Sequence, residues 1–211
     1  MLLLLFCTVV IIVYLLSLLF KLRTENKKLE SLVCEDSLTG LLNYRGFVDT
    51  LNKFSFILPQ SNLELGIKSP RKGQLSSLTL FLLDLDDFKH LNTILGYELA
   101  NKVLQEVSVA LKECFRQRDL IFRFGGDEFA VIIPGIPHEV ARELALKAIK
   151  KIGNINLSHG LELSASIGVA QARDQKAAED MFKLANEALQ SSKDSGKNQA
   201  VFYKDTTLIH C

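Results

Sequence analysis

The stretch that decides the fold of this chain is LIFRFGGDEFAVII, residues 120–133. Two short runs, residues 120–124 and 129–133, are apolar except for Arg123 and flank the tetrapeptide Gly125–Glu128. Apolar runs joined by a short glycine-containing segment are typical of a β-hairpin, so we expect the glycines at its tip. Glycine removes a side chain from that tip, which would let a ligand phosphate approach the backbone.

A second acidic element ends another apolar run. Residues 78–83 are apolar except for Thr79, which is typical of a central strand buried on both faces, and Asp84 and Asp86 follow. A buried carboxylate is costly unless it is paired or bound to a metal. If Asp84 and Asp127 meet at adjacent strand ends near backbone carbonyls, they form a hard-oxygen site suited to Mg²⁺. The alternative, favoured by the hairpin tip alone, is a surface turn with solvated acids.

The pattern of periodicity from Asp36 onward alternates between helix and strand. This order predicts an α/β (α+β) domain over residues 36–205, with a central sheet of about five strands flanked by helices and a C-terminal tail over 206–211. The expected elements are a helix ending near residue 58, a loop over 58–77, a strand over 78–83, helices up to residue 114, strands over 120–124 and 129–133, a helix over 140–152, a strand over 161–169, a helix around 181–189 and a strand over 200–203.

The N-terminal 20 residues differ from the rest. The chain has 211 residues, 48% of them apolar, and 25 Lys and Arg balance 24 Asp and Glu, so its net charge gives no argument for nucleic-acid binding. Residues 1–20 carry no charge, and only Thr8 and Ser17 are not apolar. Such a helix spans about 28 Å, close to the roughly 30 Å of a bilayer core. Because basic residues follow from Lys21 on, we expect a single-pass transmembrane helix with the globular part in the cytoplasm.

Residues 21–35 form the predicted link between this helix and the domain. Apolar residues recur with alternating spacings of four and three, which favours a short parallel coiled coil with one Asn in its seam. A solvated amphipathic helix is the alternative, because the seam covers fewer than three heptads. The seam residues are Leu15, Leu19, Leu22, Asn26, Leu29 and Val33.

Five ordered motifs identify a family. They are LTGLLNYR (38–45), DLDDFKHLN (84–92), RFGGDEF (123–129), SIGV (166–169) and KDSGKN (193–198). With these motifs the chain resembles the GGDEF family, the diguanylate cyclases, over about residues 36–203. The resemblance implies a palm-like nucleotidyl-cyclase fold at the inner (cytoplasmic) membrane. It also implies a homodimer that condenses two GTP into cyclic di-GMP and pyrophosphate, with one GTP in each domain.

The resemblance also implies roles for single residues. Asp84, Asp127 and the Leu85 carbonyl would bind Mg²⁺, with Mn²⁺ as a substitute. Glu128 would support the metal site or the deprotonation of the 3′-hydroxyl. Backbone N–H groups at the start of the helix that begins near Phe88 would hold phosphates. The remaining substrate contacts would come from Lys89, Lys193 and Lys197 to the triphosphate, Asn92 and Asn101 to guanine, and the backbone of Gly125 and Gly126.

Two departures from the family pattern concern the substrate. Asn101 stands where the family has an Asp that accepts two guanine N–H groups. An amide has one acceptor oxygen, so the sequence predicts weaker GTP binding and weaker discrimination from ATP. Lys197 replaces an Arg, which keeps the charge and loses a bidentate contact. The alternative function is a domain of low or no activity that binds GTP or cyclic di-GMP as a regulatory module.

A second site is expected before the hairpin. Arg116 and Asp119 match the family's Arg-x-x-Asp motif, which binds the product cyclic di-GMP and inhibits the enzyme. An Arg fork can bind a guanine edge or a phosphate, and an Asp can accept guanine N–H groups. The alternative is an i,i+3 ion pair at a helix end, which would contribute little.

Overall fold

The computed structural model describes residues 2–30, 34–60, 75–157, 160–204 and 207–210. The chain divides into two compact units, Met1–Cys34 and Glu35–Cys211. Within the described residues of the first unit there is one continuous helix, α1 (Leu2–Glu30). No helix in the described part of the chain has both the length and the apolar character that a membrane span needs. The span expected over residues 1–20 includes the side chains of 1–10, which lie outside the described part.

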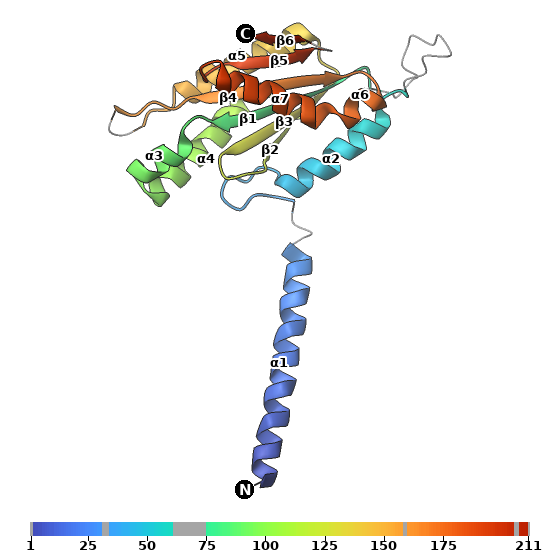
Figure 1. The fold of residues 1–211 in the computed structure, drawn as a ribbon, viewed down its shortest axis with the longest axis vertical. Coiled ribbons are helices and arrows are strands. Elements are labelled where there is room, and N and C mark those ends of the chain that lie inside the picture. The colour runs from blue at the N-terminus through green and yellow to red at the C-terminus, as the bar shows by residue number, and fades with distance from the viewer. Residues whose placement is uncertain (1, 31–33, 61–74, 158–159, 205–206, 211) are drawn as a thin grey trace. The chain divides into compact units, whose positions relative to one another are not determined.

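The second unit is built on a mixed six-stranded sheet with strand order β2-β3-β1-β4-β5-β6. The α/β architecture with helices on a central sheet is therefore confirmed (Figure 1). β1 pairs antiparallel with β3 and β4, and β5 pairs parallel with β4. The strands are β1 (Leu78–Leu85), β2 (Leu120–Arg123), β3 (Glu128–Pro134), β4 (Ala165–Ala172), β5 (Ala200–Lys204) and β6 (Thr207–His210).

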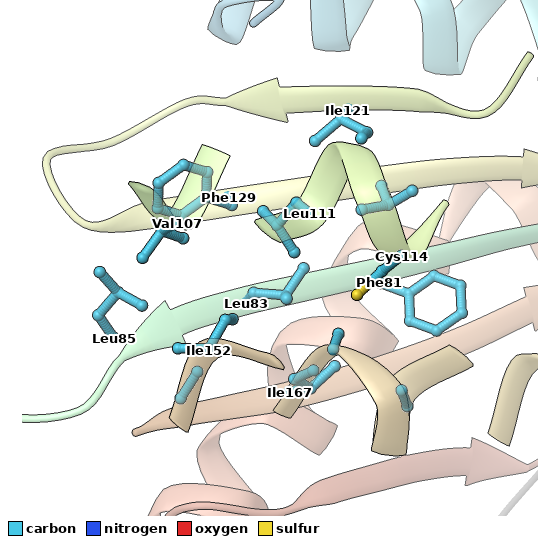
Figure 2. Packing of buried hydrophobic residues seen from close by; sticks show 14 of the residues in the cluster. Phe81, Leu83, Leu85, Val107, Leu111, Cys114, Ile121, Phe129, Ile152 and Ile167 are labelled. Atoms are coloured by element: carbon cyan, nitrogen blue, oxygen red, sulfur yellow. The ribbon is translucent and has the colours of Figure 1, made fainter. Parts of the chain in front are cut away.

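Helices cover both faces of the sheet, which explains why β1 reads as an almost unbroken apolar run. Side chains of β1 alternate between two cores: Phe81, Leu83 and Leu85 pack with α4 and α5, and Leu80 and Leu82 pack with α2 and α7. Figure 2 shows the first core, in which the β1 side chains meet those of α4 and α5. The helices are α2 (Tyr44–Ile57), α3 (Phe88–Leu95), α4 (Tyr97–Cys114), α5 (His138–Gly153), α6 (Gln175–Glu179) and α7 (Met181–Asp194).

The predicted hairpin is present, with β2 and β3 paired antiparallel around the Gly125–Glu128 tip. The strand expected over 161–169 is wrong at its start, because β4 begins at Ala165. The Ser164 carbonyl accepts the Asp86 N–H at 2.9 Å, beyond the last β1–β4 ladder pair. The structure adds α6, a single turn, and β6, which lies where the sequence predicted only a tail. Most of the predicted 58–77 loop, residues 61–74, lies outside the described residues.

Close packing of α7 on β4 depends on Gly168. A Cβ at this position would lie 2.1 Å from the Ala185 carbonyl oxygen and 2.3 Å from the Leu189 nitrogen. Such distances are far inside van der Waals contact, so only glycine lets the helix approach the strand this closely. This approach brings the last turn of α7, which carries Lys193, to the end of β1.

Candidate active site at the hairpin tip

Three carboxylates lie near one another where β1 ends and β3 begins. The register pairs Asp84 with Glu128, and the Leu85 N–H donates to the Asp127 carbonyl at 3.3 Å. Asp84 is largely buried, and the Nζ of Lys193 lies 2.9 Å from its carboxylate. The ladder and α7 therefore bring together residues that are 43 to 109 positions apart in the sequence.

The three carboxylates of Asp84, Asp127 and Glu128 are only partly neutralised by Lys193. Burial raises the pKa of Asp84, and its contact with Lys193 offsets only part of that effect, to which Asp127 adds repulsion. Burial also raises the pKa of Glu128, and the negative charges of Asp84 and Asp127 raise it further. Like charges held this close are costly unless a cation joins them.

The donor set fits a divalent cation. Two carboxylates and the Leu85 carbonyl offer only oxygen ligands, which is what Mg²⁺ and Mn²⁺ prefer. The repulsion among the carboxylates would be relieved by such an ion. In the described part of the chain no cluster of three or more His, Cys, Asp and Glu side chains is arranged for metal binding. Further ligands would have to come from water or from substrate phosphate, as is usual for Mg²⁺.

The two glycines of the tip have different surroundings. A Cβ on Gly125 would lie 2.9 Å from the Glu128 Cβ and closer still to its carboxylate, because the Glu128 side chain folds over this glycine. Nothing lies within 4 Å of the corresponding position on Gly126, which borders a pocket. The backbone approach predicted for a ligand is therefore open at Gly126, whereas the space beside Gly125 holds Glu128.

A pocket of about 600 Å³ begins at the hairpin tip and continues between α3 and α4. It brings together many of the predicted substrate residues. Phe88 borders it but is otherwise buried in the core, and the half-buried Asn92 has a side-chain oxygen without a hydrogen-bond partner. From the predicted set the pocket is lined by Phe88, Lys89, Asn92, Asn101, Gly126 and Asp127.

Lys193 and Lys197 are not among the residues that line this pocket, and each forms an ion pair with a carboxylate. Lys193 contacts Asp84, while the Lys197 Nζ lies 2.7 and 2.8 Å from the two oxygens of Asp87. This hydrogen-bonded ion pair lowers the pKa of Asp87 and raises that of Lys197. The sequence predicted triphosphate contacts for both lysines and no role for Asp87.

The hairpin is also tied to the start of the domain, which the sequence reasoning missed. The Arg123 guanidinium donates to the Gly126 carbonyl at 2.7 and 3.1 Å and to both oxygens of Asp36 at 3.0 and 3.2 Å. Asp36 also accepts the Thr39 N–H and hydroxyl. Burial alone would raise the pKa of Asp36, but the hydrogen bonds from Thr39 and Arg123 outweigh burial and lower it. The Asp-x-x-Thr spacing could have revealed the turn, whereas the contact across 87 positions could not be read from sequence.

The predicted product site lies elsewhere, in a pocket of about 470 Å³. Arg116 is exposed on its wall, and the Leu41–Leu42 segment forms part of the lining. The buried Asp119 carboxylate accepts the Arg116 backbone N–H at 2.8 Å and so closes the turn after α4. Asp119 therefore has a structural function in this turn, and both Arg116 and Asp119 line the pocket.

The structure is thus an α/β domain in which an acidic hairpin lies beside a buried strand end, with Lys193 in contact with Asp84 and a pocket next to Asp127. Residues 33–199 match the family described as "Diguanylate cyclase, GGDEF domain". The chain therefore belongs to the GGDEF family of diguanylate cyclases.

Individual relatives agree with this assignment. The chain is 31% identical over 182 residues to the diguanylate cyclase DgcM of Escherichia coli K12, covering 84% of this chain and 41% of that protein. It is 37% identical over 164 residues to the diguanylate cyclase DgcS of Shewanella oneidensis, covering 77% of this chain and 50% of that protein. The chain thus spans half or less of the length of these curated relatives.

Solved structures share the fold. The diguanylate cyclase SiaD of Pseudomonas aeruginosa, solved with its activator SiaC, superposes with a TM-score of 0.68 at 28% identity, covering 90% of this chain and 70% of that chain. The coiled coil and GGDEF domain of DgcB from Caulobacter crescentus, solved with c-di-GMP, gives a TM-score of 0.68 at 21% identity, covering 86% of this chain and 92% of that chain.

Proposed function

We propose that this chain is an active diguanylate cyclase, which condenses two GTP into cyclic di-GMP with release of pyrophosphate. The observation that carries the proposal is the set of carboxylates on Asp84, Asp127 and Glu128, held together against their own repulsion beside a large pocket. A protein does not gain stability from such a cluster, which is typical of a functional site. Family membership gives the reaction class, and the intact carboxylates favour activity over a degenerate domain.

The pocket would bind one GTP in each domain. Asn92 and Asn101 would contact guanine, because both residues line the pocket and the Asn92 side-chain oxygen has no hydrogen-bond partner within the described part of the chain. Lys89 and the backbone N–H groups at the start of α3 would hold the phosphates near Asp127. Since each domain supplies one nucleotide, two copies of the chain would have to bring their pockets face to face.

Asp84, Asp127 and the Leu85 carbonyl would hold Mg²⁺ or Mn²⁺. When bound, this ion would offset phosphate charge and lower the pKa of the attacking hydroxyl. Glu128, whose raised pKa suits it to accept a proton, would take the proton of the 3′-hydroxyl. The 3′-oxygen then forms a bond to the α-phosphorus of the other GTP, the bond to the β-phosphate oxygen breaks, and pyrophosphate leaves. Two such transfers close the ring.

The direct test incubates the full chain with GTP and Mg²⁺ and separates the nucleotides by liquid chromatography. We expect cyclic di-GMP and two pyrophosphates for each product. No cyclic di-GMP at high protein concentration would contradict the proposal.

Replacing Asn101 with Asp tests the guanine contact. The carboxylate would accept both guanine N–H groups, so we expect the preference for GTP over ATP to rise about tenfold. Competition binding with the two nucleotides measures this ratio. An unchanged ratio would show that Asn101 does not contact the base.

A second candidate function is a regulatory module that binds cyclic di-GMP. A separate pocket favours this function, because Arg116 and Asp119, in the turn after α4, line it. The cyclase proposal also includes this pocket, as a site where product inhibits. Under either function, Arg116→Ala should weaken cyclic di-GMP binding about tenfold or more, because it removes a charge-assisted contact. Titration calorimetry checks this, and tight product binding without turnover would favour the module.

We also propose that residues 1–20 anchor the chain in the inner membrane with the domain in the cytoplasm. The support is the uncharged apolar sequence, the basic residues after it, and the large apolar side chains exposed along residues 11–20 of α1. Carbonate extraction of membranes from expressing cells tests the anchor. Recovery of the chain in the soluble fraction would contradict it.

A further inference from the structure

Three residues with left-handed backbone lie in two turns of this domain that contact each other. Among the described residues other than glycine, positive φ occurs at Asp87 (53°), Lys197 (62°) and Asn198 (49°). Left-handed backbone is uncommon for residues other than glycine, although Asp and Asn adopt it more readily than Lys does, and neighbouring contacts stabilise it. These three positions lie in two turns, the turn between β1 and α3 and the loop between α7 and β5.

Specific contacts join the two turns. The Lys197 ammonium binds both carboxylate oxygens of Asp87, at 2.7 and 2.8 Å. The Asn198 N–H donates to the buried Asp86 carboxylate at 3.0 Å, and Asp86 also accepts the hydroxyls of Ser164 and Ser166 at 2.7 Å each. Asp86 thus joins the backbone of the two turns, and Lys197 fixes the position of the Asp87 side chain.

The consequence concerns the start of α3. Asp87 occupies the N-cap position, where an Asp normally accepts a backbone N–H from the first turn of its own helix. The same residue type behaves normally elsewhere in the chain: Asp174, the N-cap of α6, has extended backbone and accepts the Ala177 N–H at 2.8 Å. Asp87 makes no such bond, because its left-handed backbone and Lys197 direct its carboxylate elsewhere.

We propose that Asp87 and Lys197 are positioning residues for the GTP triphosphate: their ion pair keeps the Asp87 carboxylate off the amides at the start of α3. This inference rests on the proposed function, in which those amides and Lys89 bind phosphate. An Asp carboxylate capping the helix would occupy the same N–H groups and repel the phosphates. Lys197 thus acts through Asp87, rather than as the direct triphosphate contact that the sequence suggests.

The test measures binding of α,β-methylene-GTP, which cannot be condensed, to the full chain by titration calorimetry. Lys197→Met removes the ammonium and keeps most of the stem. We expect it to weaken binding about tenfold, because the released Asp87 can cap α3. Adding Asp87→Gly, which accepts left-handed backbone and has no carboxylate, should restore affinity to within about threefold of the original chain. Lys183→Met, an exposed lysine on α7 that is loosely paired with Glu187, is the matched control and should bind normally.

A further double variant separates capping from charge. Asp87→Asn in the Lys197→Met background is neutral but can still accept helix amides, so it should restore less affinity than Asp87→Gly. Equal rescue by both would overturn the capping mechanism. No rescue by Asp87→Gly would show that Lys197 contacts phosphate directly and would overturn the inference while the proposed function stands. Absence of nucleotide binding by the original chain would overturn both.

Discussion

The two sides of the hairpin tip hold carboxylates in opposite electrostatic states. Asp36 accepts hydrogen bonds from Arg123 and Thr39, which lower its pKa despite its partial burial. Asp84 and Glu128 are incompletely paired, and their pKa values are raised by burial and mutual repulsion. The same short segment therefore carries one carboxylate contact that stabilises the fold and one group of carboxylates that destabilises it. Asp36 therefore supports the hairpin, whereas Asp84 and Glu128 are available to bind a cation.

The largest expected effect follows from Asp127→Asn. If the proposed chemistry is correct, loss of this metal-binding carboxylate lowers cyclic di-GMP formation by at least about a thousandfold. The fold should persist, because the hairpin is held by the Arg123 contact with the Gly126 carbonyl and by the strand ladder. Asp49→Asn, an exposed change on α2, is the control for the rate assay. Comparable rates of cyclic di-GMP formation for Asp127→Asn and Asp49→Asn would contradict the proposed function of the carboxylate cluster.

Arg123→Met tests whether the contact between Arg123 and Asp36 stabilises the fold. The change leaves Asp36 half-buried without its cation and frees the Gly126 carbonyl, so we expect the free energy of unfolding to fall by about 2 kcal/mol. Urea denaturation measures this change. The matched control is Arg45→Met: Arg45 and Asp49 form an exposed pair at 3.9 Å, and its loss should cost at most about 0.5 kcal/mol. Equal losses for the two variants would show that the Asp36 contact is not a structural support.

The smallest expected effect is a gain in stability, from Glu128→Gln. Because the folded chain raises the pKa of Glu128, it holds this proton more tightly than the unfolded chain does, and stability falls as pH rises from the ordinary glutamate pKa through the raised folded value. Glu128→Gln removes that cost, so the melting temperature should rise at about pH 7 by about 2 °C, after allowance for solvent screening. The gain should disappear near about pH 4, where the original carboxyl is mostly protonated. A lower melting temperature at neutral pH would show that Glu128 is well paired.

The sequence predicted the parts of the site that lie in continuous motifs. The hairpin, the buried strand that ends at Asp84, and most of the pocket residues could be found because each has a local signature. The contacts of Asp36 with Arg123 and of Asp87 with Lys197 could not, because they join positions 87 and 110 apart. The left-handed backbone of Asp87 and Lys197 also has no residue signature, since neither is glycine. The strand expected over 161–169 was misplaced because apolar alternation continues through Leu163, which is buried without joining the ladder.

The most direct test of the central claim is divalent-cation binding at the carboxylates, since it does not depend on turnover. Electron paramagnetic resonance of Mn²⁺ added to the full chain with α,β-methylene-GTP, compared with the same Mn²⁺ and nucleotide without protein, distinguishes ion bound at the protein from ion that is free or held by nucleotide alone. We expect bound Mn²⁺ in the original chain and in Asp49→Asn, and its loss in Asp127→Asn. Equal Mn²⁺ binding by the original chain and Asp127→Asn, or none by either, would contradict the central claim.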